Sequence, residues 1–161
     1  MSESEGRFAV LRQSADAGAV AAIERLIRDA PDCDLSRVNV LDFARTNNID
    51  EERAIAAFLH AARLGLFELS WNVLCPGCGG VLDSNATLKT VDQEAYACAL
   101  CAAGYEPTLD EMVEVAFTVA PSVRRIAAHD PETLTMWQYM RQMFWSSGVE
   151  LPEGDAFDKL L

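Results

Sequence analysis

The 161-residue sequence has little basic charge. It contains 13 Lys and Arg residues against 25 Asp and Glu residues, which gives a formal net charge of −12 at pH 7. A surface this acidic repels phosphate backbones and anionic lipid headgroups. Nucleic acids and membrane surfaces are therefore unfavourable partners.

Long apolar runs and targeting signals are also missing. No apolar run approaches the roughly 18 uncharged residues that a membrane helix needs, so the sequence predicts no membrane span. The N-terminus, MSESEGRFAV, lacks the basic-then-apolar order of a signal peptide. We therefore expect a cytoplasmic protein. In that compartment close cysteine pairs are more often metal ligands than disulfides.

Catalytic signals are scarce. The sequence has two histidines, His60 and His129, and neither belongs to an HExxH motif. There is no glycine-rich phosphate loop following a strand. Cys33 lies between two aspartates, whose negative charge raises the pKa of a thiol and disfavours its use as a nucleophile. We therefore expect no enzymatic activity.

Four of the five cysteines form two close pairs. Cys75 and Cys78 are separated by two residues, as are Cys98 and Cys101. This spacing is typical of structural zinc sites, in which four sulfurs close a tetrahedral shell and leave no position for water or substrate. The sequence predicts structural Zn²⁺ at these four residues. Iron in a rubredoxin-like site would use the same ligands, and free or disulfide-bonded cysteines are the remaining alternative.

Hydrophobic periodicity predicts an α+β fold in four segments. Residues 1–18 are expected to be a flexible lead-in. Residues 19–73 are predicted to form three helices and a strand, in the order of a winged-helix-like unit. Residues 74–126 read as a zinc ribbon with its following strand. Residues 130–161 read as a C-terminal helix whose apolar pattern is still running at the last residue, which indicates a truncated chain.

Local signals set the expected boundaries of these elements. Asp50 is a capping residue for the third helix, and Gly65 suits the position that ends it. The alternation from Val113 to Val119 predicts a half-buried strand. Asp130 and Pro131 are expected to start the last helix.

The winged-helix order raises the question of DNA binding. Residues 19–71 contain six arginines against nine acidic residues. The expected recognition helix opens with Asp50, Glu51 and Glu52, where a DNA reader usually presents basic side chains. Winged helices also act as protein-interaction modules, and the charge favours that interpretation.

Three residues outside the cysteine pairs are candidates for partner contact. Arg124 follows the alternating strand and is expected to be an exposed charge. Trp137 and Trp145 lie on the apolar stripe of the last helix. An aromatic stripe at this spacing is more often core, but in a truncated chain it could meet the missing part.

Several segments together resemble a known family. They are IERLIRDAPDCDLSRVNVLDFA, FLHAARLGLFELSWNVLCPGCGGVL, VEVAFTVAPSVR and RQMFWSSGVELPE, which together span about residues 21–153. They resemble the uncharacterised N-terminal domain found ahead of class III adenylate/guanylate cyclase catalytic domains in bacterial signalling proteins.

The resemblance implies a non-catalytic regulatory or sensory module. Its partner would be a cyclase catalytic domain or its own dimer mate. The sequence departs from such proteins in having no cyclase domain and no recognisable pair of metal-binding aspartates for nucleotide cyclisation. Two alternatives stay open: a stand-alone winged-helix/zinc-ribbon transcription regulator that binds DNA, and a zinc-ribbon adaptor or ligand-binding protein unrelated to cyclases.

Overall fold

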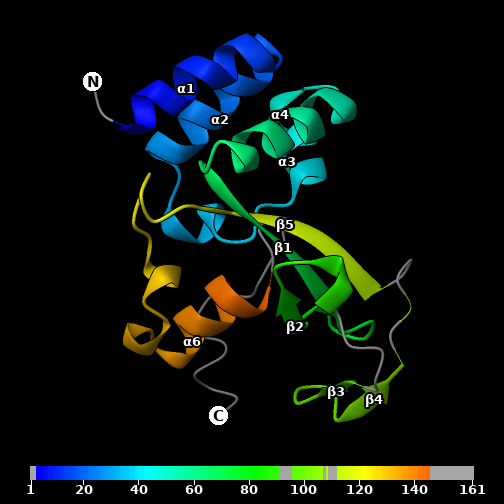
Figure 1. Ribbon diagram of the computed structural model, residues 1–161. Helices are drawn as coiled ribbons and strands as arrows, with labels where there is room; N and C mark the ends of the chain where they lie inside the picture. Colours follow the sequence, from blue (N-terminus) through cyan, green and yellow to red (C-terminus); the bar gives the residue numbers. More distant parts are fainter. Residues whose placement is uncertain (1–2, 91–95, 107, 109–111, 146–161) are drawn as a thin grey trace.

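The computed structural model describes residues 3–90, 96–106, 108 and 112–145 (Figure 1). The described chain combines helices with small antiparallel sheets, which confirms the predicted mixed α and β class. The helices are α1 (Glu3–Ser14), α2 (Ala17–Asp29), α3 (Val40–Asn47), α4 (Glu51–Arg63) and α6 (Met136–Tyr139). The strands are β1 (Phe67–Leu74), β2 (Val81–Asn85), β3 (Tyr96–Cys98), β4 (Ala103–Tyr105) and β5 (Val113–Val119). Short helical turns are η1 (Asp32–Leu35), η2 (Leu88–Thr90), η3 (Ala127–His129), η4 (Pro131–Thr133) and η5 (Met140–Phe144).

Helix α1 corrects the prediction of a flexible lead-in. Residues Glu3–Ser14 are helical, and Phe8 and Leu11 are buried in the common core. The Arg7 guanidinium also donates to the carbonyl oxygen of Gly65, at 2.8 Å. These two buried apolar side chains and the hydrogen bond to Gly65 help to hold the helix in place, although its sequence has almost no amphipathic pattern.

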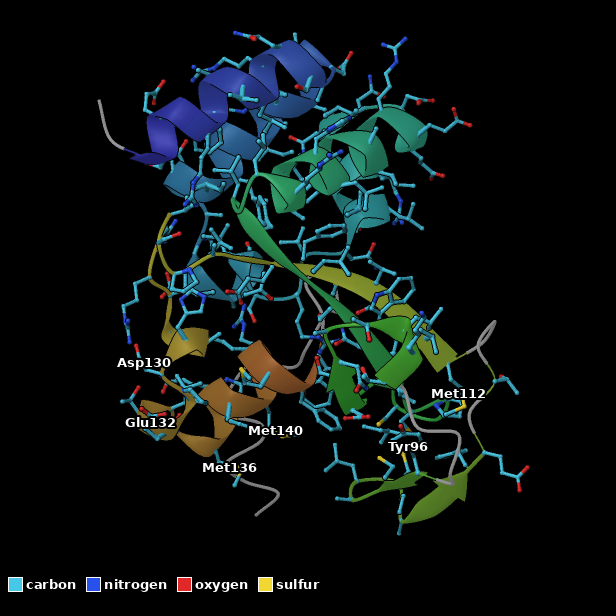
Figure 2. All side chains as sticks on the ribbon, in the orientation of Figure 1. Tyr96, Met112, Asp130, Glu132, Met136 and Met140 are labelled. Carbon is cyan, nitrogen blue, oxygen red and sulfur yellow. The ribbon has the colours of Figure 1, made fainter. Side chains whose placement is uncertain are left out.

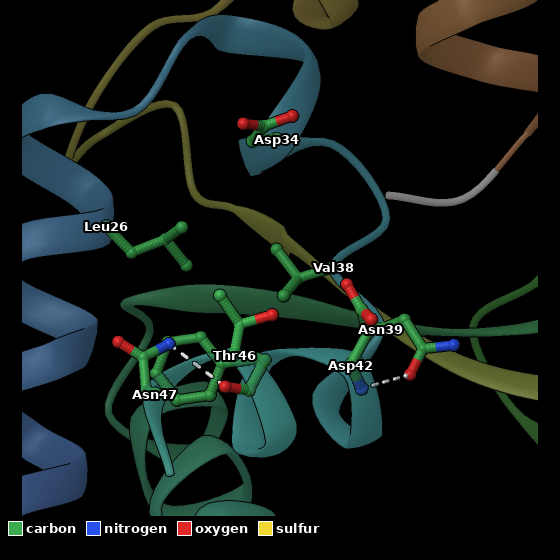
Figure 3. Close-up of a pocket in the computed structure, with 8 residues that line it drawn as sticks. Leu26, Asp34, Val38, Asn39, Asp42, Thr46 and Asn47 are labelled. Carbon is green, nitrogen blue, oxygen red and sulfur yellow. Dashed lines mark hydrogen bonds between the residues drawn. The ribbon is translucent and has the colours of Figure 1, made fainter. Parts of the chain in front are cut away.

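The three helices predicted within residues 19–73 are present, with the predicted caps. The Asp50 side chain accepts from the backbone N–H of Arg53 at the start of α4, and Gly65 follows the helix with a φ of +72°. Helix α3 begins in a similar way. The Asn39 side chain accepts from the N–H groups of Leu41 and Asp42, and Figure 3 shows the bond to Asp42.

Helices and sheet share one apolar core. In Figure 1 helices α1 to α4 lie on one side of β1 and β5, and the segment containing α6 lies on the other side. Phe58 of α4 is fully buried and contacts three other rings, with centroid distances of 5.0 Å to Phe43, 5.1 Å to Phe67 and 5.2 Å to Phe117. The helices are therefore fixed to the sheet largely through α4.

The larger sheet has the order β2-β1-β5, so β5 is an edge strand. Strand β1 pairs antiparallel with β5 from Phe67 opposite Val119 to Val73 opposite Val113. On the outer side of β5 the described residues make one isolated bridge, between Val38 and Phe117. The smaller sheet is the β3–β4 hairpin, which carries the second cysteine pair.

The second face of the larger sheet meets the C-terminal segment through polar side chains. The buried polar or charged residues of the described chain are Ser36, Arg37, Asn72 and Gln142. The Ser36 hydroxyl donates to the Gln142 carbonyl at 2.5 Å, and the Arg37 guanidinium forms an ion pair with Glu114 at 3.1 Å. This contact is more polar than the helical core.

The described C-terminal segment is less helical than the sequence predicted. Asp130 and Pro131 start only the three-residue turn η4, because Leu134 is extended. Helix α6 begins later, where Thr135 and Gln138 form a capping box, and it continues as the π-helical turn η5. The rest of the predicted helix, residues 146–161, lies outside the described residues. Within the described part of the chain, no helix has the length and apolar character to cross a membrane.

Candidate metal centre

Two similar turns position the four cysteines. In the first, which follows β1, the N–H of Gly79 donates to the Cys75 carbonyl at 2.8 Å, and Gly79 has a φ of +70°. In the second, between β3 and β4, the N–H of Ala102 donates to the Cys98 carbonyl at 2.8 Å, and Ala102 has a φ of +51°. Each turn therefore places a left-handed residue directly after its second cysteine and directs both sulfurs to one point.

The four sulfur atoms lie within 4.8 Å of one another. The Sγ atoms of Cys75 and Cys101 are 3.8 Å apart, and those of Cys78 and Cys98 are 3.7 Å apart. A tetrahedron with zinc–sulfur bonds of about 2.3 Å has edges of about 3.8 Å, whereas a disulfide bond is about 2.05 Å long. The arrangement therefore fits one tetrahedral metal ion held by four thiolates. Zinc and iron would fit equally, because both use this ligand set.

The protonation of the thiols depends on their neighbours. Burial raises the pKa of Cys75, but hydrogen bonds from the backbone N–H groups of Cys78 and Gly77 and from the adjacent thiols lower it to about 6. Hydrogen bonding to Cys78 and Cys75 raises the pKa of the Cys101 thiol to about 12. A divalent cation would let all four sulfurs be thiolates at this distance.

Tyr105 belongs to the surroundings of the cluster, and the sequence did not single it out. Its hydroxyl interacts with the Cys75 sulfur, which raises the pKa of Tyr105 to about 12. The same hydroxyl would lie 2.9 Å from a Cβ atom at Gly77. Its position four residues after Cys101, at the end of β4, is the only sequence signal.

We expect Tyr105→Phe to weaken metal binding without abolishing it. The variant keeps the ring and all four sulfurs but removes the hydroxyl that donates to Cys75. Loss of such an outer hydrogen bond typically costs about 10–100-fold in metal affinity. Competition with a chromophoric chelator would measure the change. The matched control is Tyr139→Phe, which removes the hydroxyl of an exposed tyrosine on α6. Equal metal affinity in wild type and Tyr105→Phe would contradict a hydrogen bond from Tyr105 to Cys75.

The C-terminal segment packs directly against the first cysteine turn. The Trp145 indole N–H donates to the Cys78 carbonyl at 3.1 Å. The Phe144 ring occupies the space that a Cβ atom at Gly80 would need. Phe144 and Trp145 contact each other edge to face, with ring centroids 4.9 Å apart. The metal centre and the end of the described chain are therefore in contact.

We expect Gly80→Ala to displace this segment. The added methyl group would overlap the Phe144 ring, so Phe144 and Trp145 would have to move away from the cysteine turn. Tryptophan emission should shift to longer wavelength as the buried Trp145 gains solvent. Gly6→Ala is the control, because a Cβ atom at Gly6 meets nothing within 4 Å. Unchanged emission in Gly80→Ala would show that the segment does not depend on this contact.

The candidates for partner contact are placed as follows. Arg124 is engaged within the chain: it donates to the Ile27 carbonyl at 2.7 Å and pairs with Asp32 at 3.0 Å. Trp145 is buried against Cys78, and Trp137 is half-buried on α6. A role for any of the three in partner contact stays a prediction.

The cysteine cluster differs from a second polar site of the molecule. Sulfur atoms gather near Tyr96, beside the β3–β4 hairpin (Figure 2). A hollow of about 270 Å³ between α2 and α3 is also lined by polar side chains, including Asp34 and Asp42 (Figure 3). There the amides serve the fold: Asn39 caps α3, and Asn47 donates to the Phe43 carbonyl at 2.9 Å. Within the described residues the four cysteines form the one group suited to a metal ion.

Comparison with known proteins gives one family match. A model described as a family of unknown function (DUF5939) matches residues 1–161. No curated protein and no solved structure matches the chain.

Proposed function

We propose that this chain, which belongs to the DUF5939 family of unknown function, is a non-catalytic regulatory or sensory module. It would be part of a bacterial class III adenylate/guanylate cyclase and would act through protein–protein contact. The observation that carries the non-catalytic part is the closed group of four sulfurs, in which every ligand position of a tetrahedral ion would be filled.

The metal would be structural Zn²⁺ held by Cys75, Cys78, Cys98 and Cys101. When bound, it supplies folding energy rather than chemistry, because such a site does not exist in the unfolded chain. It would join the end of β1 to the β3–β4 hairpin. Since Phe144 and Trp145 rest on the first cysteine turn, the ion would also stabilise the path of the chain toward its C-terminal end.

The link to a cyclase is supported by the resemblance of the four sequence segments. The order α2, α3, α4 followed by the β1–β2 hairpin is compatible with a winged-helix-like unit. The charge of −12 supports protein contact over DNA contact. The partner would be the catalytic domain of the same protein or the dimer mate, and the setting would be the cytosol.

The test begins with the gene. We expect the reading frame to continue beyond Leu161 into a cyclase catalytic domain, and a stop codon at that point would contradict the cyclase link. A separate measurement addresses DNA. Binding of the isolated chain to duplex DNA that weakens steeply with salt would favour the transcription-regulator alternative, whereas we expect no such binding.

A further inference from the structure

An apolar groove lies between helices α3 and α4 and the β1–β5 sheet, on the side opposite the C-terminal segment. It has a volume of about 570 Å³. Its apolar walls come from both helices and both strands, and include Leu41, Ile55, Leu59, Leu69, Trp71 and Val115. We call it the α3–α4 groove. It lies outside the cysteine cluster.

Exposed leucine and isoleucine side chains concentrate at this groove. Leu41, Ile55 and Leu59 are 46%, 39% and 48% exposed. Among the described residues, eight large hydrophobic residues are at least 39% exposed. Leu41, Ile55 and Leu59 line the same groove, and the other five do not line it. Apolar side chains exposed singly are ordinary, but a contiguous patch marks an interaction site.

The groove borders an unpaired strand edge. Phe117 directs its backbone N–H and C=O away from β1 to bridge Val38, with N···O distances of 3.4 and 2.7 Å. Because backbone direction alternates along a strand, Val113 and Val115 direct theirs to the same outer side. Among the described residues, no partner strand continues the bridge beyond Val38. Such an edge accepts an added strand.

The charge beside the groove favours a basic partner. Glu51 and Glu52 lie one turn before Ile55 on α4, and both are exposed. Neither forms an ion pair with another described residue. Opposed cations on a partner would complement them, whereas a second copy of this chain would bring a further −12 of charge.

We propose that the α3–α4 groove binds an extended segment of a partner protein whose alternating apolar residues are flanked by Lys or Arg. The segment would add a strand to β5 at Val113 and Val115 and place its apolar side chains between Leu41, Ile55 and Leu59. The open strand edge favours an extended segment over a helix. The inference deepens the proposed function and rests on its protein-contact role.

A displayed library of random twelve-residue peptides, selected against the metal-loaded chain, tests the proposal. We expect enrichment of alternating apolar peptides with basic flanks. Binding of a synthesised enriched peptide should weaken about tenfold or more in Leu59→Glu, and should weaken in Glu51→Gln/Glu52→Gln. The matched control is Leu88→Glu, an exposed leucine on η2 that does not line the groove, and it should bind normally.

Hydrogen exchange gives the second readout. The amides of Val113 and Val115 should gain protection when the peptide binds, because their N–H groups would become bonded. No enrichment, equal binding to wild type and Leu59→Glu, or unchanged exchange at β5 would overturn the proposal. The proposal would also be overturned if the wild-type chain formed a dimer that the Leu59→Glu substitution dissociates. That result would assign the groove to a second copy of the chain.

The groove proposal and the cyclase proposal can be refuted independently of each other. Loss of peptide recognition in a parent cyclase that still responds to removal of residues 1–161 would refute the groove alone. Peptide binding at the groove together with a parent enzyme indifferent to that removal would refute the cyclase role alone.

Discussion

The Cys98→Ser variant is expected to lose the metal and unfold the region around the cysteine turns, while the helices stay folded. Cys98 is buried, and its sulfur lies 3.7 Å from that of Cys78. Three sulfurs cannot complete the tetrahedral shell, and a structural zinc ion contributes roughly 10 kcal/mol or more in small zinc domains. Among the described residues, no residue between Phe67 and Phe117 belongs to the buried core of the helices, and only Leu69 and Val115 from that interval pack against it. Helical circular dichroism should therefore be largely retained.

Elemental analysis and melting measure this effect. We expect about one zinc per wild-type chain and a much lower content in Cys98→Ser. Cys33→Ser is the matched control, because Cys33 is a free, half-buried cysteine outside the cluster. Burial and the Asp34 carboxylate raise its pKa, so it is a poor ligand. A wild-type chain that contains no metal, or one whose melting is unchanged by a chelator, would contradict the site.

The Phe58→Ala variant is expected to destabilise the helical half of the molecule. Phe58 is fully buried among Phe43, Phe67 and Phe117. Removing a buried phenylalanine ring leaves a cavity and costs about 3–5 kcal/mol, a large part of the stability of a domain of this size. Chemical denaturation followed by circular dichroism would measure the loss.

Leu59→Ala is the control for this substitution. Leu59 is the next residue on α4, but its side chain is 48% exposed, so its truncation should cost far less than that of Phe58. Similar free energies of unfolding for the two variants would show that α4 does not face the sheet as described. Retained metal content in Phe58→Ala would indicate that the cysteine turns fold independently of the helices.

The sequence contained enough local information to predict α3, α4 and the cysteine cluster. Asp50 and Gly65 act on residues close to them in the chain, so their caps could be read directly. The spacing of the four cysteines also indicated one site. The contact between the Tyr105 hydroxyl and the Cys75 sulfur could not be predicted from the sequence, because it depends on how β4 folds back toward the first cysteine pair.

The errors share a physical cause, which is that distant contacts decided the outcome. Strand β2 contains Asp83, Ser84 and Asn85, residue types that usually favour turns. Ser84 donates to the Asn72 side chain at 2.8 Å, and Tyr96 donates to Asp83 at 3.1 Å. Helix α1 was missed because its stability comes from Phe8, Leu11 and the Arg7 contact to Gly65. Arg124 was expected to be an exposed charge, yet its partners Ile27 and Asp32 lie 97 and 92 residues earlier in the chain.

We propose that this chain regulates a cyclase and does not itself catalyse. The rate of cyclic nucleotide formation by the gene product that carries it, measured with and without residues 1–161, tests this proposal. We predict a change of about fivefold or more on removal, as typical regulatory coupling produces, and no product from residues 1–161 alone. An unchanged rate, or cyclic nucleotide made by residues 1–161 alone, would contradict the account.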